Sequence, residues 1–177
     1  MSAIKSTGKN GSSMNFSRTE VTEQLTSLAE KLPEYPLQEA LTARLVRLTA
    51  ESMSENLNQC LKGTGINENM WLSLLAVYLS PDQEIIPSRL SDILNLTRTS
   101  ATRLSDEMVA NKWVTRRINE YDRRQIVLSL TKEGEKLIKQ IQPMLNEKRS
   151  GLWTGFSEKD HRELQRLLGK LLDKLNK

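Results

Sequence analysis

Four arginines lie close together in the segment RRINEYDRRQIVLSLT, residues 116–131. Arg116 and Arg117 precede a short acidic turn, and Arg123 and Arg124 follow it. A guanidinium group is planar, always charged and able to donate two parallel hydrogen bonds, so such a cluster suits the binding of phosphates or base edges. The alternative is that the arginines only protect the edge of a β-hairpin, which accounts for one or two of them but not for four.

The positive charge of the chain is concentrated around this segment. The chain has 177 residues and a formal net charge of +4. Between Pro87 and Lys132 there are nine Lys or Arg and five Asp or Glu, so this stretch holds the whole excess. A local basic surface favours nucleic acid as a partner, because phosphate contacts release counterions. A solvated basic face is the other interpretation.

Composition argues against several other classes of protein. No apolar run approaches the roughly 20 residues of a membrane helix, and residues 1–17 lack the apolar core of a signal peptide, so we expect a cytoplasmic protein without a membrane partner. The single cysteine, Cys60, excludes an internal disulfide. We find no glycine-rich phosphate loop, metal-ligand cluster or nucleophile motif, and expect the single histidine, His161, to face solvent. We therefore expect no enzyme, no metal and no cofactor.

The elements that must position the arginines are mostly helical. Residues 1–14 are rich in Ser, Gly, Asn and Lys and are expected to form a disordered tail. Apolar residues at helical spacing predict helices over 17–32, 37–61, 67–79, 87–94, 97–112, 131–149 and 157–175, the sixth with a kink or break at Pro143. Ser17, Asn67, Thr97, Thr131 and Ser157 are the expected N-caps. In the helix 87–94, we expect Leu90, Ile93 and Leu94 to point inward.

Period-two alternation predicts two strands, 113–120 and 125–130, and a short third strand near Glu84. Ile126, Leu128 and Leu130 are expected to tie this hairpin to the core. The order helix, short helix, tight turn, helix, hairpin over 63–132 is that of a winged helix-turn-helix, with Asn95 in the left-handed turn. The predicted fold class is therefore mainly α with a small β-wing.

The second helix of such a pair presents residues near its N-terminus to the major groove of DNA. Every outward residue there is small and polar or an arginine, which gives the DNA-binding candidates Thr97, Arg98, Thr99, Ser100, Thr102 and Arg103, together with Ser88 in the preceding helix. An ordinary amphipathic surface helix is the alternative. Against it stands the absence of acids from Thr97 to Leu104, where the helix dipole would favour them.

The hairpin supplies the second predicted DNA contact. Arg123 and Arg124 at its tip are candidates for the minor groove, which attracts arginine where it is narrow. Arg116 and Arg117 point to opposite faces of one strand, so only one shares the DNA-facing side, and we assign this contact to Arg117. Asp122 is expected to shape the tip by accepting hydrogen bonds from a neighbouring arginine, and Arg116 to hold the hairpin by pairing with Glu120 or Asp122.

The stretch DRRQIVLSLTKEG resembles the wing signature of the MarR family of bacterial regulators, in which Asp-Arg-Arg leads through alternating apolar residues to Leu-Thr-x-x-Gly. The stretches GINENMW, LTRTSATRLSDEM and KWVTRR resemble the subgroup that represses multidrug-efflux operons, and the likeness runs from Leu37 to Gly134. The resemblance implies a homodimeric DNA-binding repressor, joined through its terminal helices, that binds a palindromic operator and is released by a small aromatic or phenolic ligand. Candidate ligand residues are Leu41, Arg44, Leu45, Leu48, Met70, Trp71, Leu74 and Met144, with a plain core role as the alternative for the Met and Trp residues.

The expected organisation has three parts. Residues 1–34 form the tail and a short helix, 35–62 with 133–177 form a helical dimerisation region, and 63–132 form the winged domain. The apolar stripes of 37–61 and 164–175 exceed what one small winged domain can cover, so a second copy is expected to bury them, with an intramolecular three-helix core as the alternative.

Three other functions stay open at this point. An oxidant-sensing regulator would use Cys60, although Lys62 is the only cation beside it in the sequence, and a buried inert cysteine is the plainer interpretation. A ligand-independent virulence or stress regulator would keep the same fold. A protein-interaction adaptor without DNA binding would not need the arginines where they are.

Overall fold

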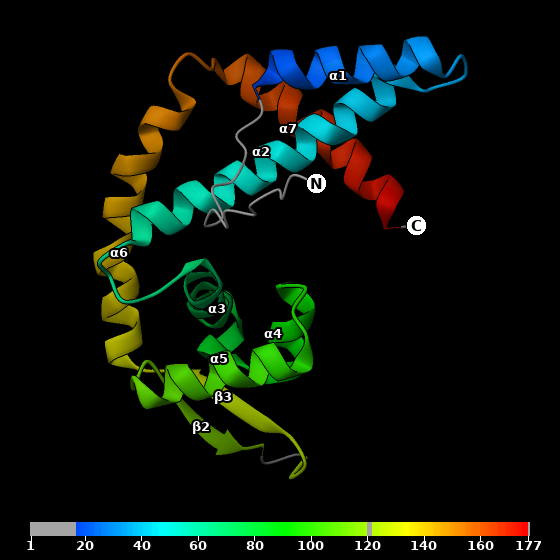
Figure 1. Ribbon diagram of the computed structural model, residues 1–177. Coiled ribbons are helices and arrows are strands. Elements are labelled where there is room, and N and C mark those ends of the chain that lie inside the picture. The colour runs from blue at the N-terminus through cyan, green and yellow to red at the C-terminus, as the bar shows by residue number, and fades with distance from the viewer. Residues whose placement is uncertain (1–16, 120–121, 177) are drawn as a thin grey trace, which may run out of the picture. The chain divides into compact units, whose positions relative to one another are not determined.

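The computed structural model describes residues 17–119 and 122–176 (Figure 1). The predicted tail at residues 1–14 and the predicted pairing of Glu120 lie outside the described residues. The chain divides between Glu55 and Asn56 into two compact units. No helix of the described residues is long and apolar enough to cross a bilayer.

The first unit contains α1 (Arg18–Lys31) and most of α2 (Leu37–Leu61). The predicted capping box at the start of α1 is confirmed. The Ser17 hydroxyl accepts from the backbone N–H of Glu20 at 3.2 Å, and the Glu20 carboxylate accepts from that of Ser17 at 2.7 Å. Val21 is buried on α1, whereas Leu28 and Leu32 are exposed.

The second unit holds the end of α2 and all remaining elements. Its helices and strands, in chain order, are α3 (Glu68–Leu79), η1 (Pro81–Gln83), β1 (Glu84–Ile85), α4 (Pro87–Ile93), α5 (Arg98–Ala110), β2 (Val114–Ile118), β3 (Ile126–Leu130), α6 (Lys132–Ser150), η2 (Gly151–Trp153) and α7 (Glu158–Leu175). This mainly helical fold with a small antiparallel sheet confirms the predicted fold class.

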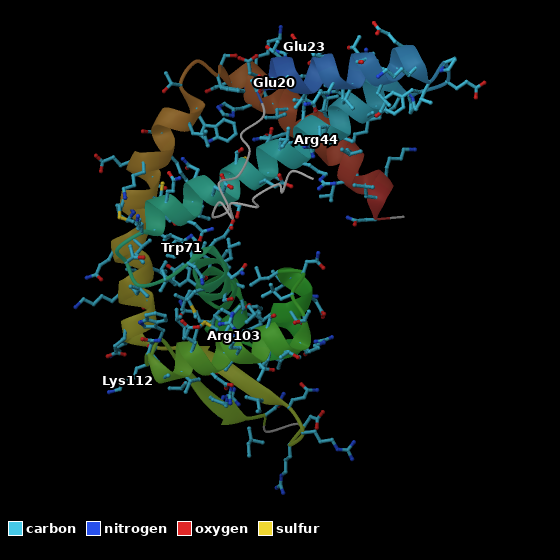
Figure 2. All side chains as sticks on the ribbon, viewed as in Figure 1. Glu20, Glu23, Arg44, Trp71, Arg103 and Lys112 are labelled. Carbon is cyan, nitrogen blue, oxygen red and sulfur yellow. The ribbon has the colours of Figure 1, made fainter. Side chains whose placement is uncertain are left out.

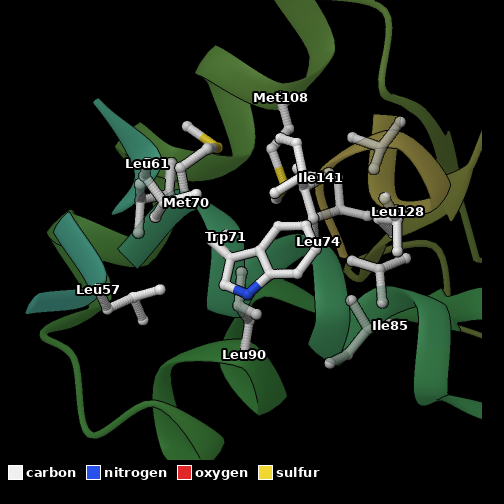
Figure 3. Close-up of a cluster of buried hydrophobic side chains, with 14 of the residues drawn as sticks. Leu57, Leu61, Met70, Trp71, Leu74, Ile85, Leu90, Met108, Leu128 and Ile141 are labelled. Carbon is white, nitrogen blue, oxygen red and sulfur yellow. The ribbon is translucent and has the colours of Figure 1, made fainter. Parts of the chain in front are cut away.

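Helix α3 is the centre of the second unit, because it contacts α4, α5, α6, β1 and β3. It is apolar on most sides, as a helix surrounded by others must be. Trp71 and Leu74 are fully buried in a cluster that Met108 of α5, Leu128 of β3 and Ile141 of α6 complete (Figure 3). Burying a large apolar side chain contributes about 1.5–3 kcal/mol, so this cluster holds the helices and the sheet together.

The sheet has the strand order β1-β3-β2, and both pairings are antiparallel. Leu128 is buried and Leu130 packs against the core, as predicted, but Ile126 is 38% exposed. Ile126 lies on the same face of β3 as Leu128 and Leu130, as the alternation predicted. It is the first residue of the strand, however, and does not belong to the buried cluster that contains Leu128. Val127, on the opposite face, is buried instead.

Three further expectations need correction. Ile93 is half exposed, and Ser91 takes the buried position in α4, donating to the carbonyl oxygen of Ser88 at 2.8 Å. Of the kink or break predicted at Pro143, the break is absent: helix α6 runs through this residue, and its buried stripe of Ile138, Ile141 and Leu145 continues across it. A kink there stays a prediction. His161 is half-buried rather than solvent-facing, with its ring centroid 5.0 Å from that of Trp153.

The Leu-Thr-x-x-Gly sequence begins at the last residue of β3 and joins the start of α6 to the turn before β2. The Thr131 hydroxyl accepts from the backbone N–H of Gly134 at 3.0 Å and donates to the carbonyl oxygen of Lys112 at 2.7 Å. Gly134 is buried directly against the carbonyl oxygen of Trp113. Only a residue without a side chain fits between this carbonyl and the helix.

We expect Gly134→Ala to destabilise the second unit by about 1–3 kcal/mol, the usual cost of inserting atoms into a packed site. The new Cβ would collide with the Trp113 carbonyl oxygen and lie 2.9 Å from Cδ1 of Leu130. Urea unfolding measures the change. Gly151→Ala is the matched control, since a Cβ there meets nothing within 4 Å, and equal stabilities of the two variants would contradict the prediction.

Glu84 links all three strands. One carboxylate oxygen accepts from the Ser129 hydroxyl of β3 at 2.6 Å, and the other accepts from the Arg117 guanidinium of β2 at 2.6 Å. The Ser129 hydrogen bond first, and then Arg117, lowers the pKa of Glu84 below its ordinary value. A carboxylate whose pKa is lower in the folded state stabilises the fold above its unfolded pKa, and this contribution disappears as pH falls through the folded pKa.

We therefore expect Glu84→Gln to be less stable than the wild type at neutral pH, with a difference that shrinks as pH falls below the ordinary pKa of glutamate. Urea unfolding across the acid range measures this difference. Glu107→Gln, at an exposed position of α5, removes the same charge and controls for net charge. A Glu84→Gln deficit that stayed constant with pH would count against the role of the carboxylate.

Candidate nucleic-acid interface

A tight turn sets the angle between α4 and α5. Asn95 has a φ of 51°, which confirms the predicted left-handed turn residue. The backbone N–H of Leu96 donates to the Ser91 carbonyl oxygen at 2.9 Å, and the Thr97 hydroxyl caps α5 by accepting from the backbone N–H of Ser100 at 3.1 Å. These local bonds close the turn, so the start of α5 is held beside α4.

One side of α5 is buried and the other is polar. Ala101, Leu104, Ser105 and Met108 are buried. The outer side carries the candidates from the sequence: Thr97, Arg98, Thr99, Thr102 and Arg103 are exposed, and Ser100 is half-buried. Arg103 lies on the middle of this helix (Figure 2). The first turn of α5 has no acidic residue, so its outer side offers hydrogen-bond donors and positive charge.

Three arginines near α5 form ion pairs with carboxylates. Arg98 lies 3.3 Å from Asp92 of α4, Arg116 lies 2.5 Å from Asp106 of α5, and Arg117 lies 2.6 Å from Glu84 of β1, each measured from guanidinium nitrogen to carboxylate oxygen. Arg116 therefore joins the wing to α5 rather than pairing with Asp122, which corrects that part of the prediction. Arg117, expected at the DNA, is engaged within the sheet.

Asp122 shapes the tip of the wing. Its carboxylate accepts from the backbone N–H of Arg124 and from the side-chain amide of Gln125, both at 3.0 Å. The expected hydrogen bond from an arginine therefore comes from the backbone of Arg124 and not from its guanidinium. Arg123 and Arg124 are exposed, so both side chains extend from a tip whose backbone Asp122 constrains.

A cleft of about 290 Å³ lies between α4, α5 and the wing. It brings together residues that are distant in the sequence, among them Pro87, Ser88, Thr102, Arg116, Arg124 and Ile126. Arg116 is paired with Asp106 and the Thr102 hydroxyl donates to the carbonyl oxygen of Arg98 at 3.0 Å, which leaves the Arg124 guanidinium and the Ser88 hydroxyl as the groups suited to an anion such as a phosphate. Ser88, Thr102 and Arg124 are all DNA-binding candidates from the sequence.

The candidate ligand residues fall into two sets. Met70, Trp71 and Leu74 are 1% exposed or less and fill the core of the second unit, with Met144 packed against it. Leu41, Arg44, Leu45 and Leu48 are half-buried on α2 in the first unit. Their role in ligand binding stays a prediction.

Sequence reasoning does not single out Glu84, Asp92, Asp106 or Gln125 as site residues. Asp92 and Asp106 are counted only among the five acidic residues between Pro87 and Lys132, and Glu84 is mentioned only as the position of a short strand. Glu84 and Arg117 are 33 positions apart, so no local spacing connects them. The excess of arginine over acid is the available signal, because clustered arginines need carboxylates nearby unless a ligand supplies the negative charge.

The chain is similar in sequence to known proteins. The family model described as "MarR family" matches residues 64–125. The transcriptional repressor MprA of Escherichia coli K12 is 32% identical over 163 residues, which cover 92% of this chain and 93% of MprA.

Solved structures show the same fold. A mutant MarR from E. coli, complexed with operator DNA, superposes with a TM-score of 0.68 at 23% identity, covering 81% of this chain and 96% of that one. Sco3205 of Streptomyces coelicolor, a MarR family transcriptional regulator in complex with DNA, gives a TM-score of 0.72 at 19% identity, covering 81% of this chain and 91% of its own. From its similarity to MprA across nearly the whole length of both chains, this protein belongs to the MarR family.

Proposed function

We propose that this protein is a transcriptional repressor that binds duplex DNA through α5 and the wing. The observation that carries the proposal is the outer side of α5, where Arg98 and Arg103 are exposed and no acid lies in the first turn. A helix of this kind fits the major groove, where arginine pairs with guanine through two hydrogen bonds. MprA, similar over most of its length, is named a transcriptional repressor.

The wing and the cleft would provide the contacts to the DNA backbone. Arg123 and Arg124 at the tip would reach the minor groove. Ser88 would donate a hydrogen bond to a phosphate beside the cleft, where Arg124 supplies positive charge. The Thr102 hydroxyl donates to the carbonyl oxygen of Arg98 at 3.0 Å, and Arg116 is paired with Asp106, so both would have to exchange a partner to join this contact. Arg117, engaged with Glu84 in the sheet, is assigned a structural role in this proposal.

Arg103→Ala and Arg124→Ala separate the two kinds of contact. Arg103→Ala should reduce discrimination between bases by about 1–3 kcal/mol at one position of the site. Arg124→Ala should weaken binding to all sequences and lower the slope of log K against log salt by about one. Both are measured by fluorescence anisotropy on a duplex selected from a random library by the wild type.

The control for these two variants is Arg162→Ala on α7, which removes one positive charge outside the proposed interface. It should leave base discrimination unchanged. Wild-type behaviour of both Arg103→Ala and Arg124→Ala would show that the interface has been placed on the wrong surface.

We also propose a homodimer in which α7 takes part. Six leucines, exposed by 38–75%, follow one side of this helix: Leu164, Leu167, Leu168, Leu171, Leu172 and Leu175. A continuous exposed apolar stripe of this size marks an interaction surface. Two copies related by a two-fold axis would present two α5 helices, which suits a palindromic operator with half-sites about one helical turn apart.

Leu171→Gln should dissociate this dimer. Each leucine counts twice in a two-fold interface. Leu171 is 39% exposed in one chain, so a dimer buries only part of the surface that is worth about 1.5–3 kcal/mol for a whole leucine, and the dimer Kd should rise about tenfold or more. Sedimentation velocity over a range of concentrations measures the change. Lys170→Gln introduces the same side chain on the polar side of α7 and should leave the dimer intact; equal dissociation of both variants would argue against the leucine stripe.

The signal that would release the repressor stays a prediction from the sequence. A small aromatic or phenolic ligand in contact with Met70, Trp71 and Leu74 would have to displace core side chains, because all three are buried. An oxidant would have to reach Cys60, which is buried and lies 3.8 Å from Oδ1 of Asn56. A regulator without any ligand is the third possibility.

A further inference from the structure

Asp92 and Arg98 form an ion pair across the turn between α4 and α5. The guanidinium of Arg98 lies 3.3 Å from the carboxylate of Asp92. The Arg98 side chain is 65% exposed and the Asp92 side chain is 55% exposed. Arg98 is the first residue of α5, and Asp92 lies in the last turn of α4. The pair therefore lies at the part of α5 that the proposed function places in the major groove.

Both residues occupy positions that helix electrostatics disfavour. The N-terminus of a helix carries partial positive charge and the C-terminus partial negative charge. Arg98 is at the positive end of α5, and Asp92 is near the negative end of α4. Each compensates the other across the turn, so the charge of Arg98 is balanced from within the protein while DNA is absent.

We propose that Asp92 is a positioning residue that determines specificity, which rests on the proposed DNA-binding function. Its carboxylate attracts the Arg98 guanidinium toward α4, leaving the N–H groups of the guanidinium to donate to a base edge. The same carboxylate neutralises Arg98 toward phosphates of unrelated sequence. Arg98 then contributes fully only where a base completes its hydrogen bonds, and contributes little on random DNA.

Arg103 provides a contrast on the same helix. It is also exposed, and it forms no ion pair with any residue of 17–119 or 122–176. No carboxylate of these residues therefore restrains the Arg103 guanidinium, whereas Asp92 restrains that of Arg98.

The test compares two duplexes of equal length: a site selected from a random library by the wild type, and a scrambled version of that site. Asp92→Asn should raise affinity for the scrambled duplex about two- to fivefold, the range expected when an exposed ion pair is removed, and should steepen its salt dependence. Affinity for the selected duplex should stay equal or fall, because Arg98 loses its orientation. The ratio of the two affinities should therefore decrease.

Two further variants make the result specific. Glu107→Gln removes one negative charge from an exposed position on α5 and should raise both affinities by the same factor, leaving their ratio unchanged. Asp92→Glu should restore the wild-type ratio, because it keeps a carboxylate beside Arg98. Thermal unfolding of the free proteins should be alike, which separates positioning from a loss of stability.

The outcomes are distinct. If Asp92→Asn raised both affinities equally, as Glu107→Gln is expected to do, Asp92 would act only through net charge and the proposed role would be overturned. If it lowered both equally, Asp92 would support the fold and not specificity, which also overturns the role. A wild-type protein that selected no duplex even at low salt would overturn the proposed function itself, and this failure is visible before any variant is made.

Discussion

The burial of one side of α5 against α3 is the constraint on which the candidate interface depends. Leu104 and Met108 belong to the same buried cluster as Trp71, and Ala101 continues their row toward the start of the helix. Since a helix repeats every 3.6 residues, fixing this row also fixes the direction of the opposite row, which carries Thr99, Thr102 and Arg103. A polar side chain in place of Met108 would therefore loosen the whole outer surface and not only the core.

Ion pairs place individual guanidinium groups, which apolar packing alone does not do. Exposed pairs contribute only about 0–1 kcal/mol each to stability, so those near α5 are poor candidates for holding the fold together. Their positions are more informative. Arg98 with Asp92 spans the two helices, Arg116 with Asp106 joins the wing to α5, and Arg117 with Glu84 spans the sheet. Each pair sets a guanidinium relative to a second element, which matters for a surface that must match the spacing of DNA grooves.

Local signals in the sequence predicted the helices and strands well. They could not predict ion pairs between residues that are distant in the sequence. The caps at Ser17, Asn67, Thr97 and Thr131 depend on residues three positions apart, so a single sequence suffices to find them. Periodicity indicates a face but not where the core ends, which is why Ile93 and Ile126 were expected inside and are exposed. The partner of Arg117 depends on strand order, which no local pattern contains.

The leucines of α7 connect stability to the proposed function. A side chain such as Leu175, 75% exposed, gains little from the fold of one chain, and the contact of the exposed leucine surface with water is unfavourable. A second copy removes this surface from water only if the two stripes face each other around a two-fold axis, because each chain offers the same stripe. That axis would then relate the two α5 helices as well. The apolar surface of α7 would in this way set the distance between half-sites, although none of its leucines would touch DNA.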